Sequence, residues 1–132
     1  MTADQPSVAV VIPVYKQGTT LAETIESVLA QQTARAVRVV VVTDGCPTST
    51  TDDVCRIYQR ARPGVVSYLR QRNRGLAGAR NAGANTALAA WPSVKSLLLL
   101  DADDRIWPTF LDSACDLLEK IPGALPERRA FR

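Results

Sequence analysis

The chain has 132 residues, which is enough for one compact domain and too few for a multidomain enzyme. Basic residues outnumber acidic residues by 16 to 13, so the net charge is only +3, and a dominant basic patch for nucleic acid is not expected. The hydrophobic fraction of 46% excludes a disordered chain.

Short apolar runs alternate with helical patterns four times along the chain, which predicts a mostly parallel sheet. The expected strands are Val8–Val14, Val37–Thr43, Val65–Arg70 and Val94–Leu100. The expected helices run from about Thr20 to Gln32, Thr51 to Arg62, Leu76 to Ala90 and Pro108 to Leu118. The third strand is the weakest and is expected near an edge of the sheet. This order predicts a Rossmann-like three-layer α/β sandwich of about four strands, with helices on both faces.

Local signals support several of these boundaries. Thr20 with Glu23 three residues later fits a capping box at the start of the first helix. Pro108 suits the first position of the last helix. Gly78 and Gly83 lie inside an alanine-rich helix, where glycine costs stability, so a close approach to the sheet or to a ligand is expected there.

The domain itself is expected to span residues 8–121. Residues 1–7 are polar and are expected to be a disordered N-terminal segment without a signal peptide. Residues 122–132 contain proline, glycine and arginine and are expected to be a loop or tail. The longest apolar runs are much shorter than a membrane span, so no transmembrane segment is expected.

The absence of histidine limits the chemistry. A Ser-His-Asp triad, a histidine-ligated zinc and an imidazole base are excluded, which leaves carboxylates, hydroxyls, arginine or a hard metal ion. Cys46, Cys55 and Cys115 are widely spaced and have no CxxC pair, so they are expected to be reduced thiols. We therefore expect a cytoplasmic protein, with peripheral association at the inner face of a membrane as an alternative.

Polar residues gather after three of the four expected strands. Ligands in open parallel sheets bind beyond the carboxyl ends of the strands, so these residues are weighted above others. They are Pro13, Tyr15 and Lys16, then Thr43, Asp44 and Gly45, then Asp101, Asp103 and Asp104. Three carboxylates within four residues repel one another, and a hard cation such as Mg²⁺ or Mn²⁺ between them relieves the repulsion. The alternative is a solvated turn that caps the next helix.

Other candidates also have two interpretations. Asp44 could cap a helix, or it could accept hydrogen bonds from a base or ribose. Tyr15 could pack at the sheet margin or stack on a nucleobase. Most of the arginines after the third strand, including Arg70 and Arg72, are expected to be solvated, but one at a helix start near a metal could neutralise a diphosphate.

Four motifs in order resemble those of the inverting, nucleotide-sugar-dependent glycosyltransferases of family 2, which have the GT-A fold. They are IPVYK at 12–16, VVTDG at 41–45, NRGLAGARNAGA at 73–84 and LLLLDADD at 97–104. The family forms read IPxYN, VDDGS, N-x-G-x-x-x-ARN-x-G and a DxD ending as LDxDD. The resemblance covers residues from about Val8 to Leu118, and four ordered motifs are far more specific than any one of them.

The resemblance implies a role for each matching residue. Pro13 and Tyr15 would line the nucleoside pocket, with Tyr15 against the base, and Asp44 would bind the base or ribose. Arg80, in the ARN motif, would border the nucleotide and its phosphates. The DxD residues complete the implied site: Asp101 near the ribose or metal, Asp103 on the metal that bridges the diphosphate, and Asp104 as an auxiliary carboxylate.

The sequence departs from the family pattern at three positions of the first two motifs. Lys16 stands where asparagine is usual, Thr43 replaces the first aspartate of VDDGS, and Cys46 replaces its serine. Nucleotide contacts are therefore expected to differ from the family's.

A further departure is that the family continues into an acceptor-binding half that carries the catalytic base, usually in an ED-type motif. Asp112, Asp116 and Glu119 follow the DxD but fit the solvated face of a helix better. The chain is therefore expected to be a truncated, donor-binding half with little or no activity alone. The acceptor and the base stay unknown.

The alternative function is a non-catalytic nucleotide-sugar-binding or assembly module that pairs with another chain, including a second copy. A receiver-like domain is disfavoured because the first strand ends in Pro13-Val14-Tyr15, without an acidic pair. A dinucleotide-binding oxidoreductase is disfavoured because no glycine-rich turn follows that strand.

Overall fold

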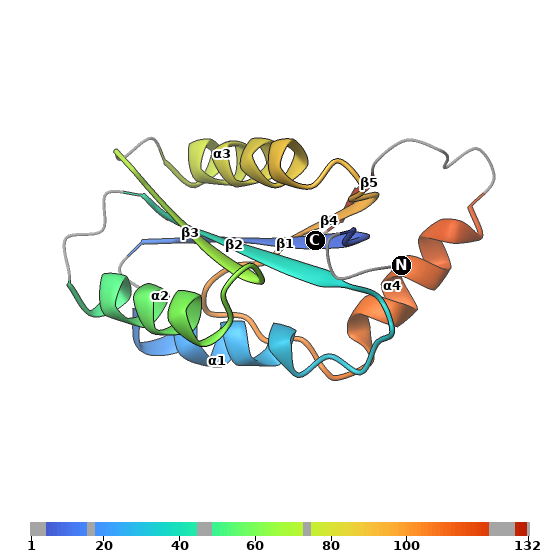
Figure 1. The fold of residues 1–132 in the computed structure, drawn as a ribbon, viewed down its shortest axis with the longest axis horizontal. Helices are drawn as coiled ribbons and strands as arrows, with labels where there is room; N and C mark the ends of the chain where they lie inside the picture. Colours follow the sequence, from blue (N-terminus) through green and yellow to red (C-terminus); the bar gives the residue numbers. More distant parts are fainter. Residues whose placement is uncertain (1–4, 16–17, 45–48, 73–74, 122–128, 132) are drawn as a thin grey trace.

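The computed structural model describes residues 5–15, 18–44, 49–72, 75–121 and 129–131. Strands and helices alternate along the chain (Figure 1). The elements are β1 (Val8–Val14), α1 (Gly18–Leu29), β2 (Val37–Asp44), α2 (Ser49–Ala61), β3 (Val66–Gln71), α3 (Gly75–Ala90), β4 (Ser96–Leu99), α4 (Phe110–Glu119) and β5 (Arg129–Phe131). The four expected strands and the four expected helices are confirmed, with boundaries shifted by a few residues.

The strands form one sheet in the order β3-β2-β1-β4-β5, and each neighbouring pair is parallel. β3 lies at one edge, as its weaker pattern predicts. β5 was not expected: Arg129 pairs with Ser96 of β4, whereas a loop or tail is predicted for residues 122–132. A three-residue strand is too short for an alternating pattern, and its pairing partner lies far away in the sequence, so the local sequence carries no signal for it.

Helices cover both faces of the sheet, which gives the expected three layers. In Figure 1, α3 lies above the sheet and α1 and α2 lie below it. Side chains alternate along β1 accordingly: Val10 and Ile12 pack with the α1 and α2 side, whereas Ala9 and Val11 pack with α3. Because both faces are covered, all seven residues of β1 are buried.

Gly83 explains how α3 can lie so close to the sheet. A Cβ atom built on Gly83 would overlap the Val11 side chain and come within 3.0 Å of Val42 Cγ2. The predicted close approach is therefore confirmed for Gly83, and it is an approach to the sheet. The close packing of α3 on the sheet offsets the stability that a glycine costs in a helix interior.

Two predicted helix starts are wrong. α1 begins at Gly18, so Thr20 lies inside its first turn and is not the N-cap; its hydroxyl donates to the Ala102 carbonyl, an acceptor far away in the sequence. α4 begins at Phe110 with Thr109 as its N-cap, two residues after Pro108. The Pro108 carbonyl instead accepts the Gln32 amide, which ties this segment to the end of α1.

None of the helices in the described part of the chain combines the length and the apolar character that a bilayer crossing needs.

Candidate functional site

The carboxyl ends of β1, β2 and β4 meet at one edge of the sheet. Val14 of β1 lies beside Thr43 of β2, and the Leu100 amide donates to the Val11 carbonyl at 2.9 Å, which extends β4 alongside β1. The residues after these strands therefore approach one another, as the parallel topology predicts.

Asp101–Asp104 forms a tight turn directly after β4, which we call the acidic turn. The Asp104 amide donates to the Asp101 carbonyl at 3.0 Å and closes the turn, while the Ala102 side chain between them is buried. Asp103 and Asp104 are exposed, and the Asp101 side chain is 50% exposed. The three carboxylates each offer an oxygen, and these oxygens lie within 4.8 Å of one another. This all-oxygen donor set suits a hard divalent ion such as Mg²⁺ or Mn²⁺.

Arg80 reaches the acidic turn from α3. Its Nη2 atom lies 3.3 Å from Asp101 Oδ1, and its side chain is 25% exposed. The structure thus brings the arginine of the ARN motif to the first carboxylate of the DxD motif. Of the other described arginines nearby, Arg72 is exposed, and Arg70 pairs with Asp52 at 3.2 Å.

Asp44 lies at the end of β2 and is only 2% exposed. Gln71, its register partner on β3, donates from Nε2 to Asp44 Oδ1 at 3.1 Å. The helix-cap interpretation of Asp44 is wrong, because α2 begins five residues later at Ser49. The carboxylate is instead held at the strand end by a side-chain amide.

Pro13 and Tyr15 lie at the carboxyl end of β1. Pro13 is buried within the strand, beside Val42, and Tyr15 is half-buried just beyond it. Their position matches the expected edge of the sheet, while the nucleoside contact implied for them stays a prediction. Lys16, Gly45 and Cys46 lie outside the described residues.

The hydroxyl of Thr43 belongs to a network on the opposite face from Asp44. Tyr68 donates its phenolic hydrogen to Asp52 of α2, so at the 3.2 Å contact between Thr43 Oγ1 and Tyr68 Oη the threonine is the donor. Burial, followed by the hydrogen bond to Asp52, raises the pKa of Tyr68 to about 12. At the position where the family has its first aspartate, this chain therefore uses a hydroxyl that is tied to Tyr68.

Two threonines of α1 also reach the acidic turn: Thr20, which the sequence predicted as a helix cap, and Thr24, for which no role was predicted. Thr20 Oγ1 and Thr24 Oγ1 donate to the Ala102 carbonyl at 2.9 and 2.8 Å. Ser27 and Gln31 contact the backbone further along the same segment. Thr20, Thr24 and Ser27 form a polar stripe beside the apolar stripe of α1, and Gln31 continues its spacing just beyond the helix; that pattern was the available signal.

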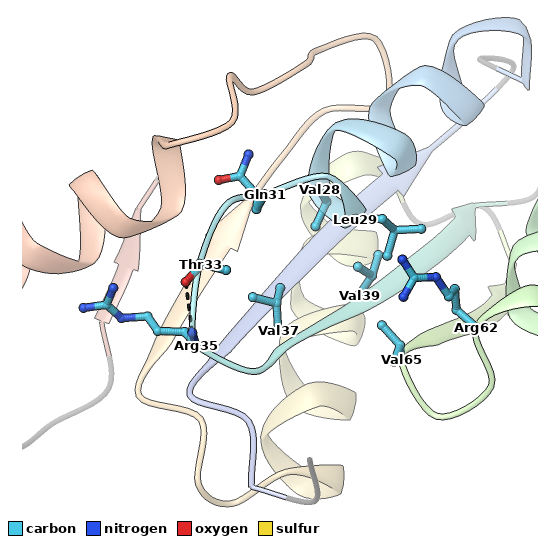
Figure 2. A pocket seen from close by; sticks show the side chains of 9 residues that line it. All are labelled: Val28, Leu29, Gln31, Thr33, Arg35, Val37, Val39, Arg62 and Val65. Carbon is cyan, nitrogen blue, oxygen red and sulfur yellow. Dashed lines mark hydrogen bonds between the residues drawn. The ribbon is translucent and has the colours of Figure 1, made fainter. Parts of the chain in front are cut away.

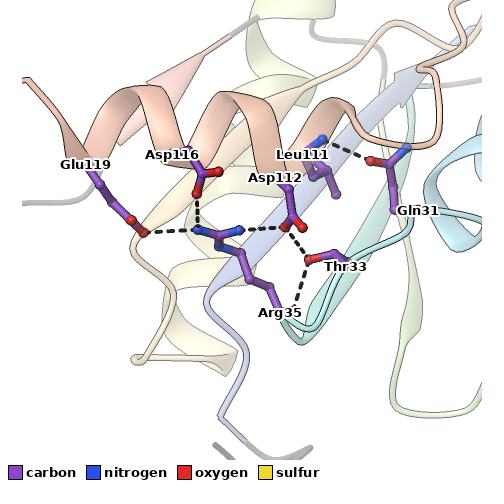
Figure 3. Close-up of polar contacts among 7 residues, drawn as sticks. All are labelled: Gln31, Thr33, Arg35, Leu111, Asp112, Asp116 and Glu119. Atoms are coloured by element: carbon purple, nitrogen blue, oxygen red, sulfur yellow. Dashed lines mark hydrogen bonds and ion pairs between the residues drawn. The ribbon is translucent and has the colours of Figure 1, made fainter.

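The acidic side chains of α4 do not belong to this site. Arg35 lies among three of them, with distances of 2.5 Å to Asp112, 3.0 Å to Asp116 and 3.2 Å to Glu119 (Figure 3). Asp116 and Glu119 are exposed, as the prediction of a solvated helix face requires, and the loop before β2 additionally brings Arg35 to this face. The Thr33 hydroxyl, followed by Arg35, lowers the pKa of Asp112 against the opposing effect of burial.

A cavity of about 200 Å³ lies at the opposite end of the sheet, near the starts of β2 and β3 (Figure 2). It is lined by Val28, Leu29, Gln31, Thr33, Arg35, Val37, Val39, Arg62 and Val65. No carboxylate is among these residues, and the acidic turn is not part of it. The candidate site is therefore the open edge formed by the strand ends.

Comparison with known proteins agrees with this architecture. The model of the family described as Glycosyl transferase family 2 matches residues 9–131. The chain is 37% identical over 103 residues to the succinoglycan biosynthesis protein ExoO of Rhizobium meliloti (strain 1021), which covers 78% of this chain and 27% of that protein. It is 36% identical over 115 residues to validoxylamine A glucosyltransferase of Streptomyces hygroscopicus subsp. jinggangensis (strain 5008), covering 85% and 25%. The chain thus spans about a quarter of the length of these relatives.

Solved structures show the same fold. The mannosyltransferase PcManGT from Pyrobaculum calidifontis, in complex with GDP-Man and Mn²⁺, superposes with a TM-score of 0.71 at 25% identity, over 89% of this chain and 33% of that one. TarS 1-349 of S. aureus in complex with UDP gives a TM-score of 0.64 at 21% identity, over 86% and 32%. These likenesses confirm the Rossmann-like GT-A fold expected from the sequence. Together with the family match over most of its length, they lead to one conclusion: the chain belongs to glycosyl transferase family 2.

Proposed function

We propose that this chain is the donor-binding part of an inverting glycosyltransferase that binds a nucleoside-diphosphate sugar of the UDP or GDP type. The observation that carries the proposal is the position of Asp101, whose carboxylate belongs to the acidic turn and also pairs with Arg80. Carboxylates for a divalent ion and a guanidinium for phosphate oxygens therefore lie side by side. This combination fits a metal-bound diphosphate.

Asp101 and Asp103 would hold the divalent ion, Mg²⁺ or Mn²⁺, with Asp104 as an auxiliary carboxylate. Their oxygens are close enough together to share one cation, and the set contains no softer ligand. The Mn²⁺ in the PcManGT complex supports this assignment. When bound, the ion would stabilise the negative charge that builds on the departing nucleoside diphosphate without supplying a proton.

The nucleoside would lie over the ends of β1 and β2. Asp44 would accept hydrogen bonds from the base or ribose, and its carboxylate is already oriented by Gln71. Pro13 and Tyr15 would line the pocket, with Tyr15 against the base. Arg80 would border the phosphates from the α3 side. The complexes of TarS with UDP and UDP-GlcNAc, and of PcManGT with GDP-Man, support a nucleotide-sugar partner.

In the transfer step, an acceptor hydroxyl would form a bond to the anomeric carbon as the bond to the diphosphate oxygen breaks. The hydroxyl proton would pass to an aspartate or glutamate base. Asp112, Asp116 and Glu119 are unsuited to that role, because Arg35 binds all three. The α4 carboxylates are therefore not assigned as the base.

Because Arg35 binds the three α4 carboxylates, none of them is free to act as a base. This observation also favours the second candidate, a non-catalytic module that binds the nucleotide sugar and associates with another chain or a second copy. The proposed nucleotide-sugar-binding domain includes residues 8–121, and β5 (Arg129–Phe131) extends its sheet. A cytoplasmic location is part of the proposal, since Cys55 and Cys115 are free thiols.

Isothermal calorimetry with UDP and with GDP, each with and without Mn²⁺, tests the proposal. We expect one of the two nucleotides to bind in the presence of Mn²⁺ and to bind much more weakly with excess chelator. Asp103→Asn should remove the metal dependence, whereas Asp53→Asn, on the exposed side of α2, should leave it unchanged. Failure of both nucleotides to bind with Mn²⁺ would overturn the proposal. Sugar release from UDP-glucose or GDP-mannose then distinguishes the two candidates: an enzyme releases the sugar, whereas a binding module binds the nucleotide sugar without releasing it.

A further inference from the structure

The acidic turn is attached to α1 through the backbone of its second residue. The Ala102 carbonyl accepts two hydrogen bonds, from Thr20 Oγ1 at 2.9 Å and from Thr24 Oγ1 at 2.8 Å. Thr24 is fully buried, and the Ala102 side chain is also buried. Both lone-pair directions of one carbonyl are thus used by hydroxyls from successive turns of the same helix.

This attachment fixes the part of the turn that carries Asp103. The Ala102 carbonyl and the Asp103 amide belong to one planar peptide unit, so holding the carbonyl oxygen sets the orientation of that plane. The hydrogen bond from the Asp104 amide to the Asp101 carbonyl closes the turn from the other side. Asp101 and Asp103 therefore project from a backbone that is held at two independent points.

The attachment continues along α1. Ser27 Oγ accepts the Ile106 amide at 3.2 Å. One turn later, Gln31 donates from Nε2 to the Trp107 carbonyl at 2.7 Å and accepts the Leu111 amide at 2.9 Å. The segment from the acidic turn to α4 thus lies along a row of polar side chains that runs through α1 and ends at Gln31, two residues beyond the helix. Within this stripe of described residues, Thr20 and Thr24 are the two that reach the acidic turn itself.

The carboxylates of the turn oppose this arrangement when no cation is bound. Three oxygens of like charge within 4.8 Å repel one another, and the repulsion favours a more open turn. Hydrogen bonds to the backbone resist that opening without neutralising the carboxylates. A turn held in this way loses less conformational freedom when the ion and the diphosphate bind, and so binds them more tightly.

We propose that Thr20 and Thr24 are positioning residues that preorganise the acidic turn for a divalent ion and its diphosphate ligand. The inference rests on the proposed function, because it assigns these hydroxyls to the same metal-bound nucleotide. The positioning role differs from a purely structural role in one respect. A structural role lowers stability whatever the ligand, whereas a positioning role weakens metal-dependent binding in particular.

The experiment uses Thr20→Val and Thr24→Val, which remove a hydroxyl and keep the side-chain volume. Thr24→Ser keeps the hydroxyl and serves as the rescue variant. Thr19→Val makes the same chemical change at an exposed position of α1 and is the matched control. Calorimetry measures the affinity for UDP and GDP with Mn²⁺ and with chelator, and amide hydrogen exchange of Asp104 reports on the turn without any ligand.

We expect each valine variant to lower Mn²⁺-dependent nucleotide affinity by about fivefold to tenfold, the usual effect of one hydrogen bond. The Asp104 amide should exchange faster by a similar factor. Affinity in chelator should be unchanged, and Thr24→Ser and Thr19→Val should behave like the wild type. Should Thr24→Val fail to fold, Thr20→Val, which lies at the partly exposed start of the helix, carries the test.

Two results would overturn the inference. The first is a valine variant that unfolds more easily but binds Mn²⁺ and nucleotide as the wild type does, since that describes a structural role alone. The second is unchanged Asp104 exchange in both valine variants. If the wild type itself binds neither nucleotide with Mn²⁺, the proposed function fails and the positioning role fails with it; the exchange data alone then report whether the hydroxyls hold the turn.

Discussion

Arg80 on α3 and Asp101 at the end of β4 form an ion pair, with 3.3 Å between Nη2 and Oδ1. The pair connects the helix layer to the sheet beside the candidate site, because α3 covers one face of the sheet and the acidic turn follows the sheet strand β4. It also places one positive charge beside three negative ones. A diphosphate bound there would contact the guanidinium directly and the carboxylates through a divalent ion.

Arg80→Gln should weaken nucleotide binding without unfolding the protein. Loss of one charge-assisted hydrogen bond to a phosphate oxygen corresponds to about a tenfold or greater loss of affinity. The ion pair is partly exposed, so the free energy of unfolding should change by less than about 1 kcal/mol. Calorimetry in Mn²⁺ measures the first quantity and urea unfolding the second.

Arg72→Gln is the matched control, since it removes the same charge from an exposed position after β3. An equal loss of affinity in both variants would mean that general electrostatic attraction, and not a contact made by Arg80, accounts for the effect.

Tyr68→Phe should change stability at alkaline pH. The pKa of Tyr68 is raised from 10.0 to about 12 in the folded protein. The folded state therefore keeps the proton while the unfolded state releases it, so this contribution to stability is complete below pH 10 and is lost as the pH rises towards 12. Phenylalanine cannot titrate, and the free energy of unfolding should fall less steeply over this range in Tyr68→Phe.

The pKa of Tyr58 is also raised to about 12, by burial and by its hydrogen bond to Glu26. Tyr58→Phe is therefore the comparison variant in the same unfolding series, and it should show a similar reduction in slope. A Tyr68→Phe curve parallel to that of the wild type from pH 9 to 12 would contradict the raised pKa.

Gly83→Ala should destabilise the protein, although alanine is the better helix former. The added Cβ would overlap Val11 and approach Val42, and such overpacking costs about 1–3 kcal/mol. Thermal and urea unfolding measure the change. Val11→Ala removes the overlapping atoms, so the double variant should be more stable than the sum of the two single effects predicts. Simple additivity would show that Gly83 does not contact Val11 as described.

Thr33→Val should lower stability near neutral pH and have less effect in acid. The Thr33 hydroxyl and Arg35 hold the pKa of Asp112 below its usual range. Because a depressed carboxyl pKa stabilises the folded state above the unfolded value, this contribution is lost as the pH falls through the folded value. The difference in unfolding free energy between wild type and variant should therefore shrink below about pH 4. A difference that is constant with pH would contradict the role of Asp112.

The strands and the positions of the site residues could be predicted because the signals are local. The four valines at 39–42 predict a buried strand, and Asp101 directly follows the apolar run at 97–100. Parallel topology then brings Asp44 and Asp101 to the same edge of the sheet. Each step needs only a short stretch of sequence and a general rule.

The long-range contacts, both at the site and at α4, could not be predicted in this way. Thr24 and Ala102 are 78 residues apart, and Arg35 and Asp112 are 77 apart, so no periodic pattern connects either pair. The misassigned cap at Thr20 has the same cause: a hydroxyl at the start of a helix can cap that helix or bind another segment, and only the tertiary structure decides.

Nuclear magnetic resonance with Mn²⁺ as a paramagnetic probe tests the central claim most directly, because Mn²⁺ broadens the amide signals nearest to it. With UDP or GDP present, we expect selective loss of the signals of residues 101–104 and weaker broadening at Arg80 and Asp44. Asp103→Asn should abolish the effect. Selective broadening at Asp112, Asp116 and Glu119 of α4, with the acidic turn unaffected, would contradict the account.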